Sequence, residues 1–80
     1  GIDIIVFTSS STVKHLAALI EPKTLSELLK DVTIACIGPV TAKTLSNFGL
    51  KTHIMPTTYT IKSLIEKIVQ WEITSDFNIA

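Results

Sequence analysis

The stretch Ile34–Leu45, which reads IACIGPVTAKTL, constrains the fold of this chain most strongly. It opens with an uninterrupted apolar run, which is typical of a strand covered on both faces in a parallel sheet. Gly38 gives the following turn its backbone freedom, and Pro39 suits a first helical turn, where its missing N–H has no helical partner. The stretch therefore predicts a strand, a tight turn and a helix N-terminus, which is a natural seat for a phosphate or carboxylate.

The same strand–loop–helix pattern appears twice more in the chain. The β-rich run Ile2–Phe7 leads through the hydroxyl-rich loop Thr8–Thr12 into a helical pattern that starts at Val13. Near the other end, a less apolar strand at Leu50–Met55 leads through Pro56–Thr60 into the last helix. We therefore expect three strands, with the middle one at residues 32–37.

The helix boundaries follow from capping and periodicity. Glu21-Pro22 is expected to end the first helix, because a residue before proline is pushed out of the α region. Thr24 and Glu27 form a capping box, which predicts a short helix ending near Lys30. The next helix, residues 39–48, is expected to end at a left-handed Gly49. The last helix is expected to fray after Trp71, leaving residues 74–80 as a tail. Its apolar positions have helical spacing: Ile61, Leu64, Ile65, Ile68 and Val69.

Three such units in a row predict the α/β class: a parallel sheet of three βα units, flavodoxin-like, over residues 1–73. The loops after the strands share one edge of such a sheet, where ligands bind. Sheets of this kind usually have about four to six strands. We therefore expect the sheet to be incomplete without the rest of a longer protein or a second chain, and self-association through unpaired edges fits the same pattern.

Composition excludes several classes of protein. The formal net charge is zero, with 7 basic and 7 acidic residues, which argues against a nucleic-acid partner. No apolar run approaches the roughly 20 residues of a membrane span, and no export signal is visible, so the cytoplasm is expected. Cys36, the one cysteine, is expected in the core. His15 and His53 have no partner at metal-ligand spacing, so no metal is expected.

The candidate binding residues lie in the three loops. Ser9, Ser10 and Ser11 are either helix caps or ligand contacts. Gly38 and Pro39 are required by the turn in any case, so their interest lies in where the backbone N–H groups point. A hydroxyl in the first turn, at Thr41, is expected to face a bound anion. In the third loop, one of the threonines is expected to be there as the N-cap of the last helix, without any contact to a ligand.

At these loops the sequence resembles the uroporphyrinogen-III synthase family. The resembling blocks are VFTSSSTV, IACIGPVTAKTL followed by NFGL, and PTTYTIKSLIEKI, which appear in the family's order and spacing. The middle block is the most specific, because a strand ending in IGP, then one residue, then TA is a family hallmark. The resemblance covers the chain up to about Val69 and matches the last portion of that family.

The resemblance implies a fold and an activity. Members have two α/β domains, and this chain would be the C-terminal contribution to one of them. The enzyme closes hydroxymethylbilane, which carries eight carboxylates, into uroporphyrinogen III, inverting the last pyrrole ring and losing water, in heme biosynthesis. It uses no metal and no organic cofactor, and a piece of this length alone is expected to be inactive. Positions carried over as substrate-binding are Ser9, Ser10, Gly38, Pro39, Thr41, Tyr59 and Thr60, with Ser11 beside them.

The catalytic group is not assigned. In that family, the tyrosine proposed as the acid lies in the linker outside this stretch, so Tyr59 is interpreted as a loop residue. The alternative function is a small non-enzymic flavodoxin-like module that binds an anion or a protein partner at the strand-end edge. A receiver domain is disfavoured because acidic residues are missing at the strand ends. A P-loop enzyme is disfavoured because no glycine-rich Lys-Ser/Thr loop is present.

Overall fold

Two parallel strands form the centre of the computed structural model, which describes residues 3–78. Strand β1 (Ile4–Phe7) pairs with β2 (Thr33–Cys36), in a register that sets Val6 opposite Ala35. Both strands lie inside the predicted segments and are shorter, with Ile2 outside the described residues. The α/β class and the parallel pairing are thus confirmed.

The predicted third strand, Leu50–Met55, is largely absent. It is reduced to one isolated parallel bridge between Ala35 and Ile54. The Cys36 N–H donates to the Ile54 carbonyl at 2.9 Å, and the His53 N–H donates to the Ile34 carbonyl at 2.8 Å. The described sheet therefore has two strands and one flanking bridge, so three complete βα units and a flavodoxin-like fold are not confirmed.

The His53 side chain adds a bond that sequence reasoning did not anticipate. Its Nδ1 accepts the Ile34 N–H at 2.9 Å, on the side of β2 that faces away from β1. An imidazole nitrogen that accepts a hydrogen bond carries no proton, so the neutral ring has its proton on Nε2. Backbone and side chain of His53 together hold this segment against β2.

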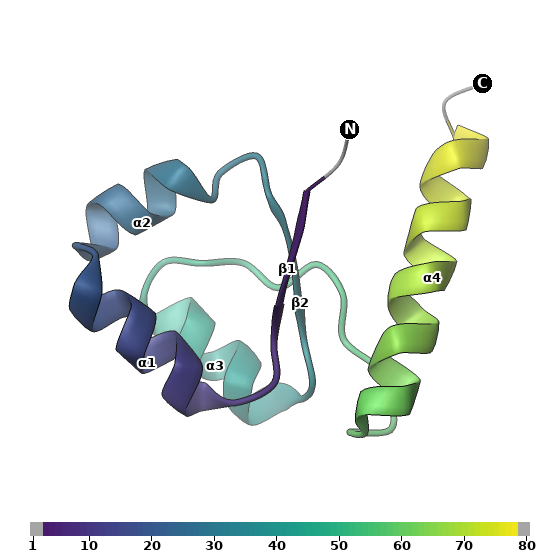
Figure 1. Ribbon diagram of the computed structural model, residues 1–80, viewed down its shortest axis with the longest axis horizontal. Coiled ribbons are helices and arrows are strands. Elements are labelled where there is room, and N and C mark those ends of the chain that lie inside the picture. Colours follow the sequence, from purple (N-terminus) through teal and green to yellow (C-terminus); the bar gives the residue numbers. More distant parts are fainter. Residues whose placement is uncertain (1–2, 79–80) are drawn as a thin grey trace.

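Three helices cover one side of the strands, and α4 (Ile61–Asn78) lies on the other (Figure 1). Helix α1 (Ser10–Leu19) starts earlier than Val13, because Ser9 caps it. Helix α2 (Pro22–Leu28) starts at its proline, which is pre-organised for a first turn. The predicted capping box is therefore wrong: Thr24 lies inside α2, and the helix ends before Lys30.

Helix α3 (Pro39–Asn47) starts where the Gly-Pro pair predicts and ends at a left-handed glycine. Gly49 has φ +77°, a conformation that costs residues with a Cβ roughly 1–2 kcal/mol. The Leu50 N–H then returns to the Leu45 carbonyl at 2.9 Å, closing the helix end. The predicted C-cap is confirmed.

The core forms on both faces of the strands. The face toward α1–α3 buries the larger cluster, whose buried members are Phe7, Val13, Leu25, Ile34, Cys36, Leu45 and Leu50. On the opposite face, Ala35, Ile54 and Leu64 form a smaller cluster beneath α4. Cys36 has no exposed surface, so its predicted place in the core is confirmed.

Helix α4 differs from its sequence pattern in two ways. It continues past Trp71 to Asn78, so the expected helix end lay too early, and residues 79–80 lie outside the described part. Among the α4 residues whose side chains are described, Leu64 and the partly buried Ile68 pack on the strands, whereas a stripe at four-residue spacing stays exposed: Ile61, Ile65, Val69 and Ile73. No helix among the described residues has the length and apolarity that crossing a membrane requires.

Candidate functional site

The three strand-to-helix loops meet at one edge of the sheet. Helices α1, α3 and α4 all begin at the lower edge of the view in Figure 1, where β1 and β2 end. The Ile37 N–H donates to the Phe7 carbonyl at 3.1 Å, which holds the two strand ends together. The strand order β1–β2, with the Ile54 bridge beyond β2, sets the loops side by side in chain order.

In the first loop, the serines have different roles. The Thr12 N–H donates to Ser9 Oγ at 3.3 Å, and Ser9 Oγ lies 3.0 Å from Thr12 Oγ1. Ser9 is therefore the N-cap of α1, and its hydroxyl is engaged by the helix. Ser10 Oγ is buried without a hydrogen-bond partner among the described residues. Ser11 is exposed in the first turn.

The second loop leaves its helix start uncapped. Gly38 is the N-cap of α3 and is buried, and it has no side chain with which to bond the helix. Pro39 has no N–H, so the backbone N–H groups of Val40 and Thr41 are the donors that this terminus offers. The thiol of the buried Cys36 donates to the Gly38 carbonyl at 3.5 Å, and this bond ties the loop to the core.

Thr41 lies in the first turn of α3 and is buried, with 4% of its surface exposed. The expectation that its hydroxyl faces a bound anion stays a prediction. Thr44, one turn later, donates from Oγ1 to the Val40 carbonyl at 3.1 Å. These two small side chains let α3 lie close to the core. What Thr41 offers at the open edge is its backbone N–H.

The third loop contacts the second through Tyr59. A Cβ placed on Gly38 would lie 3.3 Å from Tyr59 Cγ and 3.4 Å from Cδ1, so the ring rests on the glycine. Thr60 caps α4, because its Oγ1 accepts the Ser63 N–H at 3.2 Å. The expectation that capping accounts for one threonine of this loop is confirmed. The Tyr59 contact was not anticipated, because nothing in the sequence links positions so far apart.

The chemistry of this edge is neutral and rich in donors. Residues 8–12, 38–41 and 56–60 include no charged side chain. Apolar groups are exposed beside the donors: Val40 is 74% exposed, and Tyr59 and Ile61 are each 58% exposed. Helix N-termini carry a partial positive charge, which favours anions even where no cationic side chain is near. Within the described residues, no group of three or more His, Cys, Asp or Glu side chains is placed to hold a metal ion.

Fold and edge together define an α/β chain in which three helices begin at the edge where the parallel strands end. The family model described as uroporphyrinogen-III synthase HemD matches residues 1–66. The chain therefore belongs to the uroporphyrinogen-III synthase family, whose members are enzymes of tetrapyrrole biosynthesis. No solved structure matches the chain.

Three archaeal relatives support this assignment, each named "Putative uroporphyrinogen-III synthase". The protein of Methanocaldococcus jannaschii is 38% identical over 65 residues, covering 81% of this chain and 26% of the relative. That of Methanothermobacter thermautotrophicus is 39% identical over 66 residues, with 80% and 26% covered. That of Archaeoglobus fulgidus is 42% identical over 64 residues, with 80% and 27% covered. The chain thus spans about a quarter of the length of these relatives.

Proposed function

We propose that this chain supplies part of the substrate site of a uroporphyrinogen-III synthase. In this proposal, the complete enzyme closes hydroxymethylbilane to uroporphyrinogen III in the cytoplasm, with inversion of the last pyrrole ring and loss of water. The three strand-end loops bind carboxylates of that substrate. No catalytic acid is assigned to this chain, and Tyr59 positions the third loop.

The uncapped start of α3 is the observation that carries the proposal. The N–H groups of Val40 and Thr41 are free of side-chain caps among the described residues. They lie next to the Gly38–Tyr59 contact. Each hydrogen bond from such a group to a carboxylate contributes roughly 1.5–3 kcal/mol. Ser10, Ser11 and Thr60 border the same edge from α1 and α4. The exposed Val40 and Tyr59 side chains supply apolar surface for a pyrrole ring.

Uncovered surfaces support a larger assembly. Within the described residues, β1 pairs only with β2, so its other edge is open. Val6 on this strand is 43% exposed, although it faces the side of the sheet that α4 partly covers. The apolar stripe of α4, from Ile61 to Ile73, is also exposed. In this proposal, strands and helices from further sequence of the same enzyme cover these surfaces, and self-association is the alternative.

A chimera tests this function directly. The 65 matched residues of the Methanocaldococcus jannaschii relative are replaced by the corresponding residues of this chain, with the intact relative as control. We expect the chimera to convert hydroxymethylbilane to the type III isomer, separated chromatographically from type I. The chain alone is expected to yield no type III product, because it would supply only part of the substrate cleft.

Two outcomes would contradict the proposal. One is that the chimera is folded and monodisperse but makes no type III isomer, under conditions in which the intact relative does. The other is type III synthesis by the isolated chain, which would contradict only the claim that this chain supplies just part of the substrate cleft. Replacing Gly38 by Trp in the chimera provides a matched negative variant, since the bulky ring would displace Tyr59 from the second loop.

A further inference from the structure

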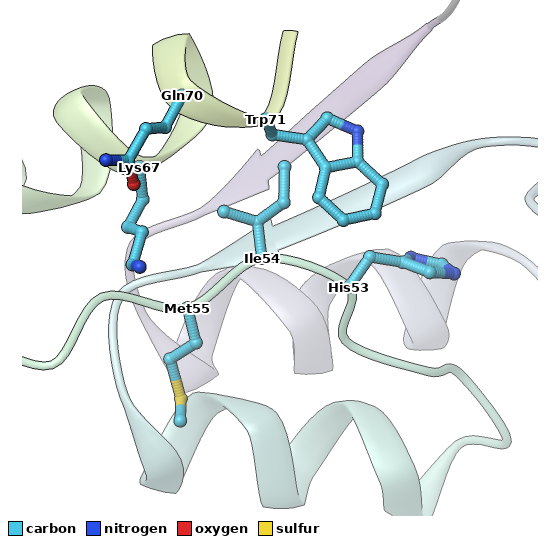
Figure 2. A pocket seen from close by; sticks show the side chains of 6 residues that line it. All are labelled: His53, Ile54, Met55, Lys67, Gln70 and Trp71. Carbon is cyan, nitrogen blue, oxygen red and sulfur yellow. The ribbon is translucent and has the colours of Figure 1, made fainter. Parts of the chain in front are cut away.

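A hollow of about 370 Å³ lies away from the strand-end loops, between α4 and the segment that flanks β2. Figure 2 shows Lys67 and Trp71 reaching from α4 toward the segment of Ile54 and Met55. His53 and Gln70 complete its lining. Its volume is near the lower end of the range for small-molecule sites, which is about 300–1,000 Å³, so it suits a ligand with a single ring.

The floor of this hollow is apolar, and it offers an aromatic face. Ile54 is 3% exposed and forms part of the core beneath α4. Trp71 is 37% exposed, so part of the indole is open to a ligand. An aromatic ring stacking in an offset arrangement is the partner that an indole face prefers.

The polar groups around the hollow favour an anion. Lys67 contributes an ammonium group, and none of the six lining residues is a carboxylate. Glu66 lines the neighbouring hollow of about 290 Å³, toward Thr57 and Thr58, and Lys67 and Gln70 border both hollows. The bond from the Ile34 N–H to His53 Nδ1 fixes the imidazole and leaves Nε2–H as its donor. The ammonium of Lys67 is a group suited to a carboxylate, whereas Figure 2 shows the His53 ring on the side of the hollow away from Lys67.

We propose that this hollow, bounded by His53, Ile54, Lys67 and Trp71, binds a small aromatic carboxylate. Its ring stacks on Trp71 above Ile54, and its carboxylate pairs with Lys67. The site is separate from the strand-end loops, and it stands or falls independently of the proposed enzymatic function.

Benzoate is the probe for the test. Trp71 is the one tryptophan of the chain, so its fluorescence reports on this hollow. We expect a saturable emission change with a midpoint of about 1–10 mM, as ligand efficiency allows for so small a molecule. Amide resonances of His53, Ile54 and Met55 are expected to shift with the same midpoint. Benzyl alcohol and acetate, which lack the charge and the ring respectively, are each expected to bind at least about fivefold more weakly.

The matched variants are Lys67→Gln and Lys62→Gln. Both lysines are exposed on α4, but only Lys67 lines the hollow, so neither change threatens the fold. Lys67→Gln is expected to weaken benzoate binding about fivefold or more, and Lys62→Gln to leave it unchanged. A response to benzoate that is linear up to about 50 mM, well above the expected midpoint, would overturn the proposal. So would equal effects of the two variants, or benzyl alcohol or acetate binding as tightly as benzoate.

Discussion

Ser9 and Ser10 are adjacent residues with opposite consequences for stability. Ser9 Oγ accepts the Thr12 N–H, whereas Ser10 Oγ is buried without a partner among the described residues. Loss of an N-cap typically costs about 1 kcal/mol, so Ser9→Ala is expected to lower the free energy of unfolding by about that amount. Removal of an unsatisfied buried hydroxyl relieves a desolvation cost, so Ser10→Ala is expected to be neutral or stabilising. Urea unfolding followed by circular dichroism measures both.

Ser11→Ala serves as the control for this pair. Ser11 is exposed in the same turn, so its replacement is expected to change stability by less than about 0.5 kcal/mol. Equal destabilisation by Ser9→Ala and Ser10→Ala would contradict the division of roles between cap and unpartnered hydroxyl.

Single residues were predictable from sequence where local chemistry determines their role. Cys36 in the core and the left-handed Gly49 after α3 depend on neighbours in the chain and were predicted. The burial of Thr41 was not, because it depends on how closely α3 approaches the core. The contact of Tyr59 with Gly38 joins two loops that only the assembled sheet brings together.

At the scale of elements, the His53 side chain helps to hold the segment after α3 on β2. The Ile34 N–H donates to His53 Nδ1, beside the backbone bonds that the His53 and Ile54 N–H groups donate to the Ile34 carbonyl. His53→Ala leaves that N–H without its partner, which is expected to cost about 1–2 kcal/mol. Hydrogen exchange of the Ile34 amide is expected to accelerate roughly tenfold or more, because this segment opens more readily.

His15→Ala is the matched control, since His15 is the chain's other histidine and lies exposed on α1. It is expected to leave exchange at Ile34 unchanged. Unaltered Ile34 exchange in His53→Ala would show that the side chain does not hold the segment.

The elements also show where sequence patterns mislead. Thr24 and Glu27 have capping-box spacing, yet Pro22 starts the helix earlier, because a proline at the first helical position competes with the later cap. The third strand was expected from the repeated strand–loop–helix pattern, but among the described residues it forms only a bridge at Ile54. The periodicity of α4 correctly predicts a helix, although half of its apolar face remains exposed.

At the scale of the whole molecule, the most important feature is the edge of the sheet at which the strands end. Helices α1, α3 and α4 begin at the same edge (Figure 1). Residues 8–12, 38–41 and 56–60 at this edge include no charged side chain, and we propose that backbone amides bind a carboxylate there. The common edge follows from consecutive parallel βα connections, which the sequence pattern predicted even though the third strand did not form. The sequence alone does not show which donors at this edge remain free. The structure shows that Ser9 and Thr60 already cap their own helices.

A titration of the ¹⁵N-labelled chain with butane-1,2,3,4-tetracarboxylate tests this claim most directly. This probe is a flexible polycarboxylate without an aromatic ring, so it does not address the hollow beside Trp71. We predict that the amide resonances of the helix starts shift together with one midpoint: Ser10, Ser11, Val40, Thr41 and Ile61. Shifts confined to amides near lysines away from that edge, such as Lys23, Lys30 and Lys51, would contradict it.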